Sequence, residues 1–477
     1  MTRPLQGHAS YRAHVNANRR VMIGVALVAT AVRLPGVYTQ AFWQDEVASA
    51  RIIGEPTFAG LLAHVERTES TPPLWYALGW LLHQAGTPIQ DVRLLSVAAG
   101  ALLAALVAGL ALRFVPLPFA ALAGLFVALG GELVGHGQEL RAYELLALLS
   151  VVFARCLLAE LDRPSRRREL ALGAAVAAGG LTHYFFAFSV VAALAWLWLD
   201  RDVRAVRRRA TVAIVSGGTV AAAWGPLMIR QFHQGRFWWI GSFRLRTVLA
   251  VPTRIFTYAY SNTSAGVAVS LIGLLLVASG CARLGRGSAP GRLVATLALA
   301  PVAEAAVVWA GGMRIFALRN LIGVAPFVAV AIAAALASVP RRAAGPLWAA
   351  AAAFLILPFI PFLGAEGGTP PYDAMARALV ADGWTPSQPV AVFGNFYPYR
   401  APLEWYLPHR PVLDASVLSS RVCTTVFVLR GDDVQKLHLT VPIRADRQLH
   451  GATILVDPKA SPKCVRPIRT GHLAALS

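Results

Sequence analysis

The sequence predicts an all-α polytopic membrane protein that carries a small α/β domain at its C-terminus. Of its 477 residues, 56% are hydrophobic and only 14% are charged, whereas soluble proteins have about 25% charged residues. Apolar runs long enough to cross a bilayer recur along residues 21–364. After Gly364 the composition becomes more polar, and Gly367–Pro371 (GGTPP) is typical of a linker.

The formal net charge of +20 does not indicate a nucleic-acid partner. The basic residues of the chain cluster in short segments between apolar runs, such as Arg163–Arg168 (RPSRRR) and Arg201–Arg209 (RDVRAVRRR). Short cytoplasmic loops of membrane proteins have this composition. The four cysteines have neither CxxC nor Cys/His spacing, so the sequence predicts no zinc site.

Eleven transmembrane helices are expected, since a helix of about 20 apolar residues crosses a bilayer. They cover residues 21–38, 92–112, 117–135, 143–160, 169–182, 184–199, 210–229, 265–282, 293–310, 319–338 and 346–364. Residues 1–20 are polar and basic, which predicts a cytoplasmic tail before a retained first span rather than a cleaved signal peptide.

The stretch Pro73–Ala85 is apolar but short, and charge decides its placement. If it crossed the membrane, both arginine-rich segments named above would lie outside. If it lies flat, these segments, together with Arg283–Arg292, face the cytoplasm, as the positive-inside rule requires. We therefore predict a cytoplasmic N-terminus, an extracytoplasmic C-terminus and a long outer loop, residues 39–91, that carries flat helices.

Residues 365–477 are predicted to be an exported domain. Its expected elements are a helix near Tyr372–Ala381 and strands at Val390–Phe393, Thr424–Leu429 and Thr453–Val456. Cys423 and Cys464 are its two cysteines, and we expect a disulfide between them because the compartment is oxidising. Cys156 and Cys281 lie in spans and are expected to be small core residues.

The predicted topology gathers polar side chains on the outer face. Asp45 and Glu46 stand side by side just after the first span, and an ionisable pair at a membrane is a functional-site hypothesis. Arginines such as Arg141 and Arg319 also lie outside, against the topological bias. An anionic ligand is the simplest explanation for them.

Several short motifs follow one another in a recognisable order. They are Asp45–Glu46, Thr71–Trp75 (TPPLW), Arg93–Gly100 (RLLSVAAG), Arg141–Tyr143 (RAY), Thr182–Phe186 (THYFF) and Arg319–Pro326 (RNLIGVAP). Over residues 20–340 this order resembles the GT-C glycosyltransferases, in particular glycosyltransferase family 39 and its relatives. That branch includes protein O-mannosyltransferases and the aminoarabinose transferases of lipid A. The chain departs from the common pattern at Thr71, where a His usually stands, and at Asn320, where a Tyr does.

The resemblance implies a cell-membrane enzyme that transfers a sugar from a polyprenyl-phosphate donor to an extracytoplasmic acceptor with inversion. The acceptor could be a protein, a lipid or a cell-envelope glycan. Asp45 matches the family's proposed general base, and Glu46 could orient the acceptor, help to bind a divalent cation or cap the following helix. The leaving phosphate needs fixed positive donors, and the planar arginine side chain suits it. The expected substrate-binding residues are Arg93, Arg141, Tyr143, His183, Tyr184, Arg314 and Arg319.

Each of these residues also has a structural alternative. Arg93 could form an ion pair that fixes the outer loop, Tyr143 could sit at the membrane interface, and His183 could be a packing residue among aromatic rings. Membrane lipids are expected partners, and no cofactor or metal ion is predicted, although a divalent cation is compatible with the acidic pair. The alternative functions are a lipid or small-solute transporter, disfavoured because no halves repeat, and a non-catalytic membrane scaffold.

Overall fold

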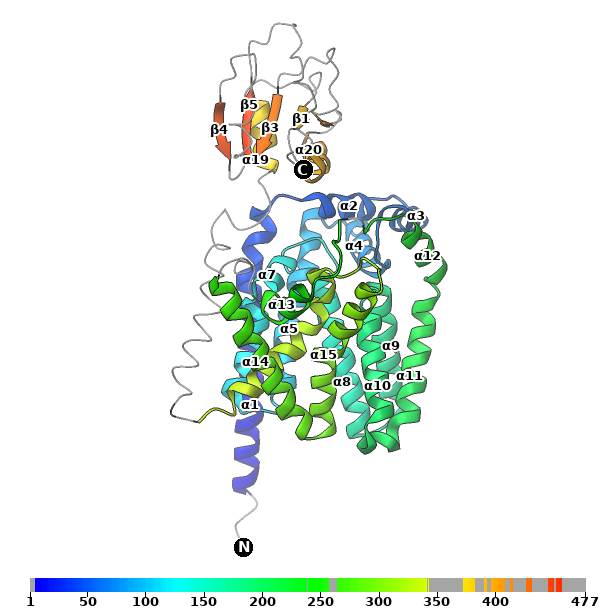
Figure 1. Ribbon diagram of the computed structural model, residues 1–477, viewed down its shortest axis with the longest axis vertical. Helices are drawn as coiled ribbons and strands as arrows, with labels where there is room; N and C mark the ends of the chain where they lie inside the picture. The colour runs from blue at the N-terminus through cyan, green and yellow to red at the C-terminus, as the bar shows by residue number, and fades with distance from the viewer. Residues whose placement is uncertain are drawn as a thin grey trace. The chain divides into compact units, whose positions relative to one another are not determined.

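The computed structural model describes residues 5–237, 239–256, 264–340 and 342, and in the C-terminal part residues 372–381, 390–392, 396–407, 412–414, 426–430, 445–449 and 452–456. The chain forms two compact units (Figure 1). The helical unit takes Met1–Val37 and Ile52–Leu363, and the mixed unit takes Tyr38–Arg51 and Gly364–Ser477. The predicted disulfide between Cys423 and Cys464 lies outside the described residues.

Most of the helical unit is α-helix. Its helices up to the middle of the chain are α1 (Leu5–Thr39), α3 (Phe58–Thr68), α4 (Leu74–Gln84), η1 (Ile89–Arg93), α5 (Leu94–Ala111), α6 (Leu117–Leu129), α7 (Gly131–His136), α8 (Tyr143–Asp162), α9 (Arg166–Thr182) and α10 (Phe186–Leu199). The later ones are η2 (Arg201–Val203), α11 (Arg204–Ala222), α12 (Gly225–His233), α13 (Leu245–Arg254), α14 (Ser264–Arg286), α15 (Ala289–Ala310), η3 (Leu318–Val324) and α16 (Ala325–Leu336). Helix α2 (Gln44–Ile53) begins in the mixed unit.

Several of these helices can cross a membrane. By length and composition, four stretches among the described residues qualify: Val15–Thr39, Ile89–Ala111, Ala289–Ala310 and Leu318–Leu336. Helices α11 and α12 qualify as a pair that is bent by 57° at a short break. The chain is therefore a membrane protein, as predicted. The total of eleven spans stays a prediction, and the span expected at 346–364 lies outside the described residues.

Two spans predicted as continuous helices are interrupted, and the sequence prediction was wrong there. Helix α6 ends at Leu129, because Gly130 has an extended backbone (φ −61°, ψ 125°), and the short α7 follows. The span predicted at 210–229 breaks between Ala222 and Gly225. Pro226 lies in the first turn of α12, where its missing N–H does no harm, but it could not continue α11.

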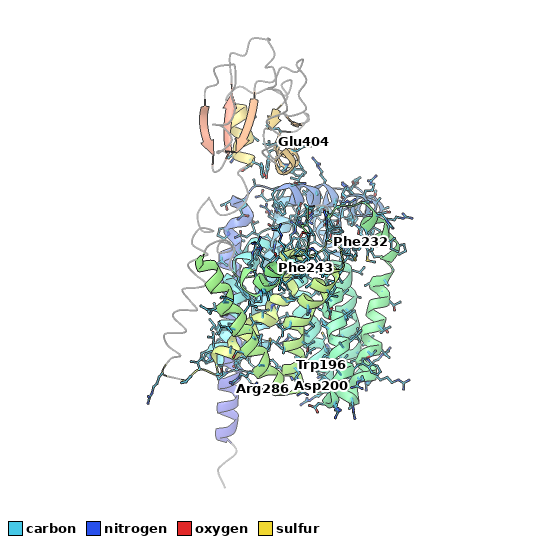
Figure 2. The ribbon with its side chains drawn as sticks, viewed as in Figure 1. Trp196, Asp200, Phe232, Phe243, Arg286 and Glu404 are labelled. Atoms are coloured by element: carbon cyan, nitrogen blue, oxygen red, sulfur yellow. The ribbon has the colours of Figure 1, made fainter. Side chains whose placement is uncertain are left out.

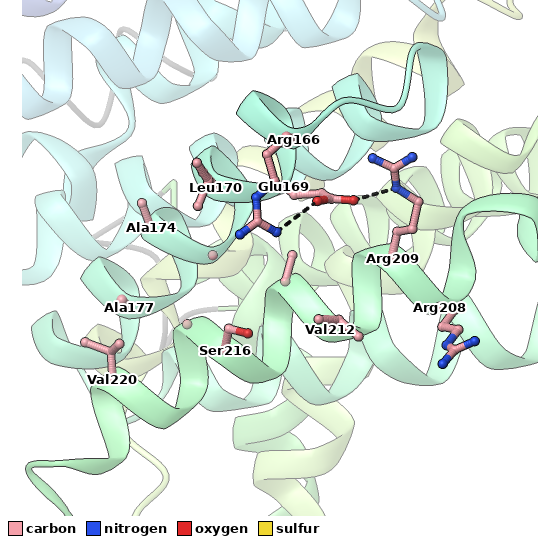
Figure 3. Close-up of a pocket in the computed structure, with 13 residues that line it drawn as sticks. Arg166, Glu169, Leu170, Ala174, Ala177, Arg208, Arg209, Val212, Ser216 and Val220 are labelled. Carbon is pink, nitrogen blue, oxygen red and sulfur yellow. Dashed lines mark hydrogen bonds and ion pairs between the residues drawn. The ribbon is translucent and has the colours of Figure 1, made fainter.

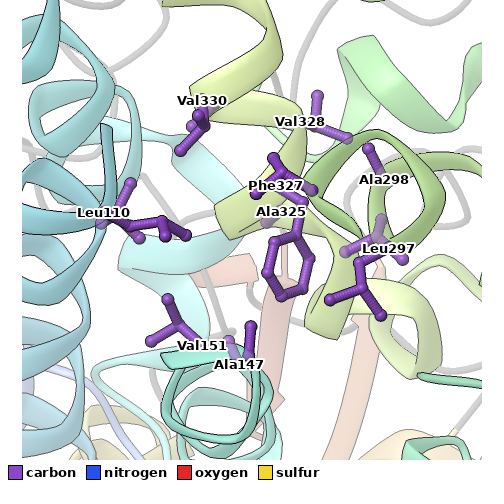
Figure 4. Packing of buried hydrophobic residues seen from close by; sticks show 14 of the residues in the cluster. Leu110, Ala147, Val151, Leu297, Ala298, Ala325, Phe327, Val328 and Val330 are labelled. Atoms are coloured by element: carbon purple, nitrogen blue, oxygen red, sulfur yellow. The ribbon is translucent and has the colours of Figure 1, made fainter. Parts of the chain in front are cut away.

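Helix α16 forms the centre of the helical unit. All twelve of its residues are buried, and it packs against α5, α6, α14 and α15. Figure 4 shows Phe327 in one cluster with Leu110, Val151 and Leu297, from three other helices. Much of α16 is Ala, and such small side chains let the neighbouring helices approach closely. Close packing matters because the hydrophobic effect does not drive helices together inside a lipid bilayer.

A buried ion pair fixes the start of α8, which the sequence analysis did not foresee. The Arg33 guanidinium donates to Glu144 Oε1 at 2.9 and 3.1 Å, and both side chains are fully buried. It also donates to the carbonyls of Val127 and Ala128 at the C-terminal end of α6, which carries partial negative charge. A charge buried among apolar helices needs this many partners. The Arg33–Glu144 pair therefore holds α1, α6 and α8 together at Glu144, the residue that follows Tyr143.

The outer-loop helix α4 has 11 residues. At 1.5 Å per residue it is about 16 Å long, roughly half the thickness of a bilayer core. It begins directly after Pro72–Pro73, with Pro73 at its N-cap. Trp75 and Tyr76 are buried on its inner face. This length agrees with the prediction that Pro73–Ala85 does not span, and its depth in the membrane stays a prediction.

The mixed unit contains a five-stranded sheet of order β2-β1-β3-β5-β4. Its strands are β1 (Val390–Val392), β2 (Val412–Asp414), β3 (Val426–Arg430), β4 (Ala445–Leu449) and β5 (Ala452–Val456). Strands β1, β2 and β3 are parallel, whereas β3, β5 and β4 pair antiparallel. Helices α19 (Tyr372–Ala381) and α20 (Phe396–Tyr406) belong to the same unit. Strands β1, β3 and β5 overlap the expected strands, while the extracytoplasmic placement stays a prediction.

Candidate active site

The site is built around Tyr143, the first residue of α8, whose side chain is buried. Its ring centroid lies 4.6 Å from that of His136 and 5.9 Å from that of His183. The guanidinium carbons of Arg141 and Arg319 each lie 5.8 Å from the same centroid. Three of the predicted substrate-binding residues, Arg141, His183 and Arg319, thus meet at the ring of a fourth, Tyr143. Their roles stay predictions.

Arg319 stands in η3, at the start of the segment that continues into α16. Its guanidinium carbon lies 4.8 Å from the Trp239 ring centroid, in addition to the contact with Tyr143. Contacts of this kind stabilise the cation through the faces of the rings. Hydrogen bonds to an anion use the edge of the guanidinium, so aromatic stacking is compatible with phosphate binding.

Arg141 is held by a carboxylate that the sequence analysis missed. Its two terminal nitrogens lie 3.1 and 3.3 Å from the carboxylate oxygens of Glu69, and one of them donates to the Tyr76 hydroxyl at 3.3 Å. Thr71 Oγ1 lies 3.0 Å from that hydroxyl. Burial raises the pKa of Tyr76 well above its ordinary value, although the Arg141 charge opposes this, so the hydroxyl stays protonated. Glu69 therefore balances the charge of Arg141, and the role of Arg141 in binding phosphate stays a prediction.

His183 caps the C-terminus of α9 and is buried. Burial, together with the charges of Arg141 and Arg319, lowers its pKa to about 3. The ring is therefore neutral at physiological pH. Its Nδ1 accepts a hydrogen bond from the Phe185 backbone N–H at 3.2 Å, which leaves the proton on Nε2. His183 can thus donate one hydrogen bond to a ligand without adding a third positive charge.

His136 is the second imidazole against Tyr143, and it was not among the predicted site residues. Its Nδ1 lies 2.9 Å from a Glu139 carboxylate oxygen, and its Nε2 lies 3.5 Å from Glu132. Burial alone would lower the pKa of His136, but the carboxylates of Glu139 and Glu132 raise it above its ordinary value. The H-x-x-E spacing just before the RAY motif was the available sequence signal.

Other predicted site residues have different surroundings. Arg93 is buried and donates to the Val37 carbonyl at 2.9 Å, which ties η1 to the end of α1. Tyr184 accepts from the Trp224 indole at 3.0 Å and packs against Phe232. Arg314 is exposed in the stretch before η3. Figure 2 labels Phe232 and Phe243 at one end of the helical unit, and Asp200 and Arg286 at the other.

Asp45 and Glu46 lie in the first turn of α2, in the mixed unit. The Trp43 backbone N–H donates to a Glu46 carboxylate oxygen at 3.4 Å. The segment is anchored by the Phe42 backbone N–H, which donates to the Tyr406 hydroxyl at 2.8 Å. Nearby, Arg51 lies 3.8 Å from Glu404 and Phe42 packs on Trp405. That the acids and the arginines converge in one pocket stays a prediction.

Among the described residues, no three His, Cys, Asp or Glu side chains are grouped so that they could hold a metal ion. That the protein works without a metal ion stays a prediction. The described cysteines are free, Cys281 buried and Cys156 half-buried, as expected for core residues.

No protein-family model matches the sequence. No curated protein matches it either. Solved structures do match its fold. The apo crystal structure of ArnT from Cupriavidus metallidurans has a TM-score of 0.57 at 15% identity, covering 90% of this chain and 96% of that one. The same enzyme bound to undecaprenyl phosphate has a TM-score of 0.53 at 14% identity, covering 92% and 98%.

An oligosaccharyltransferase from Archaeoglobus fulgidus, in complex with Zn and sulfate, has a TM-score of 0.51 at 13% identity, covering 87% of this chain and 68% of that one. These proteins are GT-C glycosyltransferases. The chain therefore has the GT-C fold, as its motifs predicted, and its place in glycosyltransferase family 39 stays a prediction.

Proposed function

We propose that the protein is a membrane glycosyltransferase that takes a sugar from a polyprenyl-phosphate carrier and transfers it, with inversion, to an extracytoplasmic acceptor. The GT-C fold supports this, as does the undecaprenyl phosphate bound to ArnT. In this proposal the N-terminus is cytoplasmic and the C-terminus extracytoplasmic, so the site faces the outer leaflet.

One observation carries the proposal: Arg319 is stacked between Tyr143 and Trp239, beside the neutral His183. Charge develops on the phosphate as the carbon–oxygen bond to the sugar breaks. Arg319 is positioned to bind that phosphate with its planar edge, and His183 Nε2 is a suitable neutral donor. Arg141, paired with Glu69, positions the wall of the site.

In the same reaction the acceptor hydroxyl attacks the anomeric carbon from the side opposite the phosphate. It loses its proton to a carboxylate within hydrogen-bond reach, and we assign this role to Asp45. Glu46 is assigned to orienting the acceptor. A single displacement of this kind inverts the anomeric centre, and it leaves polyprenyl phosphate as the second product.

The experiment uses purified full-length protein in proteoliposomes with undecaprenyl-phosphate monosaccharides, each carrying a radiolabelled sugar. Asp45→Asn should lower transfer at least 100-fold, the scale of general-base catalysis, while donor binding is kept. Arg319→Gln should lower both transfer and donor binding, because it removes the phosphate ligand.

The matched controls are Asp91→Asn, an acid of the same outer loop, and Arg230→Gln, an exposed outer arginine that pairs with Glu66. Both should keep transfer within a few-fold of the wild type. Wild-type turnover by Asp45→Asn would refute the base assignment, and wild-type donor binding by Arg319→Gln would refute the phosphate assignment.

A further inference from the structure

A groove lies between α9 and α11 (Figure 3). Its volume is about 440 Å³. Helix α9 begins at Arg166, beside the groove, and ends one residue before His183, and its 17 residues make it about 25 Å long. The groove is lined by Arg166, Glu169, Leu170, Gly173, Ala174, Ala177, Arg208, Arg209, Val212, Ala213, Ser216, Gly217 and Val220.

One end of the groove is basic. Glu169 lies between Arg166, at 3.6 Å, and Arg209, at 2.5 Å, and Arg209 also lies 3.6 Å from the buried Glu160. Arg208 has no carboxylate partner among the described residues, and in Figure 3 its side chain points away from Glu169. Three guanidinium groups thus face two carboxylates, which leaves a positive excess at the mouth.

The remainder of the groove is apolar and has a floor of small residues. A Cβ atom on Gly217 would lie 2.1 Å from the Gly173 carbonyl oxygen, so the two helices meet backbone to backbone there. Larger apolar side chains stand on the rims, where Leu170 is 60% exposed and Val212 is 58% exposed. In a membrane these rims face lipid. A narrow channel of this shape gives close van der Waals contact to an extended hydrocarbon chain.

We infer that this groove binds an anionic phospholipid of the membrane. Its phosphate would lie at Arg208 and Arg166, and one acyl chain would follow the small-residue floor toward Val220. Arginine-rich pockets between transmembrane helices suit lipid phosphates because the charges are paired away from bulk water. A soluble anion would use the basic mouth alone and would leave the apolar channel without an occupant. This inference does not depend on the proposed transferase activity.

The test is native mass spectrometry of the full-length protein in detergent, titrated with phosphatidylglycerol or with phosphatidylcholine. Phosphatidylglycerol should bind roughly tenfold more tightly than the zwitterionic lipid, since surface arginines favour anionic headgroups. The double variant R166Q/R208Q should lose this preference. Its matched control is R167Q/R204Q, which removes the same charge from two exposed arginines of α9 and α11 outside the groove.

A second pair of variants tests the channel. Ala174 lines the groove and is exposed, whereas Ala171, also exposed, lies outside its lining. Ala174→Phe should weaken phosphatidylglycerol binding, and Ala171→Phe should not. Equal losses in both members of either pair would overturn the inference. So would displacement of phosphatidylglycerol by inorganic phosphate at equal concentration, which would indicate a simple anion site.

Discussion

Two arginine side chains of the helical unit are held in buried ion pairs. Arg33 and Arg141 are each matched by a buried carboxylate, Glu144 and Glu69. Arg319 contacts the faces of two aromatic rings. Removing one member of a buried ion pair costs about 3–5 kcal/mol, because the other charge is left without compensation. Changes at Arg33 or Arg141 should therefore act first on stability.

The two imidazoles against Tyr143 predict opposite pH dependences. The folded state lowers the pKa of His183 to about 3. Between about pH 6.5 and pH 3 the unfolded state therefore binds a proton that the folded state does not, and the protein loses stability as the pH is lowered. The pKa of His136 is raised, so its contribution is full below about pH 6.5 and is lost as pH rises through the folded pKa.

We therefore expect His183→Asn to reduce the loss of thermal stability between pH 7 and pH 5, and His136→Asn to increase it. The measurement is the unfolding midpoint of each purified variant in detergent at both pH values. The assignment fails if the two variants change the pH dependence in the same direction.

At the scale of elements, the junction of α1, α5 and α8 depends on glycines that leave room for a charged side chain. A Cβ atom on Gly100 of α5 would lie 2.5 Å from both Arg33 Nε and Glu144 Oε1. Arg33 cannot move aside easily, because it is fully buried and bonded to three backbone carbonyls as well as to Glu144.

Gly100→Ala should therefore destabilise the protein by about 1–3 kcal/mol, the usual cost of overpacking. The control is Gly218→Ala in α11, where a Cβ atom would meet nothing within 4 Å. That change should be neutral or slightly stabilising, since Ala favours helix more than Gly does. Thermal unfolding of both variants measures the difference, and equal midpoints would contradict this account of the junction.

The same elements show how far the sequence could be interpreted. The long apolar runs predicted α5, α15 and the segment η3–α16, because hydrophobic length alone specifies a membrane helix. The breaks after Leu129 and Ala222 were missed, because an apolar run stays apolar where the backbone turns. The order of the motifs singled out Tyr143 and Arg319 as site residues, and the two side chains are in contact. The pairing of Arg141 with Glu69, 72 positions away, could not be predicted, because it depends on tertiary packing.

At the scale of the whole molecule, the segment that carries Asp45 belongs to the same compact unit as the C-terminal part. Phe42, three residues before Asp45, contacts both Tyr406 and Trp405 of α20. If Asp45 is the base, its position depends on these contacts, and a displacement of about 1 Å can lower a rate about 100-fold.

Removal of residues 372–477 should therefore lower sugar transfer by about that factor and leave donor binding intact, because the Tyr143 cluster lies in the helical unit. The assay is the proteoliposome transfer reaction. Tyr406→Phe, which deletes one hydrogen-bond acceptor and keeps the ring, should have a much smaller effect. Transfer at the wild-type rate by the truncated protein would mean that the C-terminal part is accessory.

The Arg33–Glu144 pair also has a consequence for how the protein is made. Its partners are 111 positions apart, so at about 5–20 residues per second the ribosome adds Glu144 roughly 5–20 s after Arg33. A lone arginine costs about 2.5–3.5 kcal/mol at the centre of a helix inserted by the translocon and less toward its ends, so Arg33, close to the end of α1, adds part of this cost. We therefore expect the first helix to be anchored less firmly during synthesis until the α8 segment emerges and supplies Glu144.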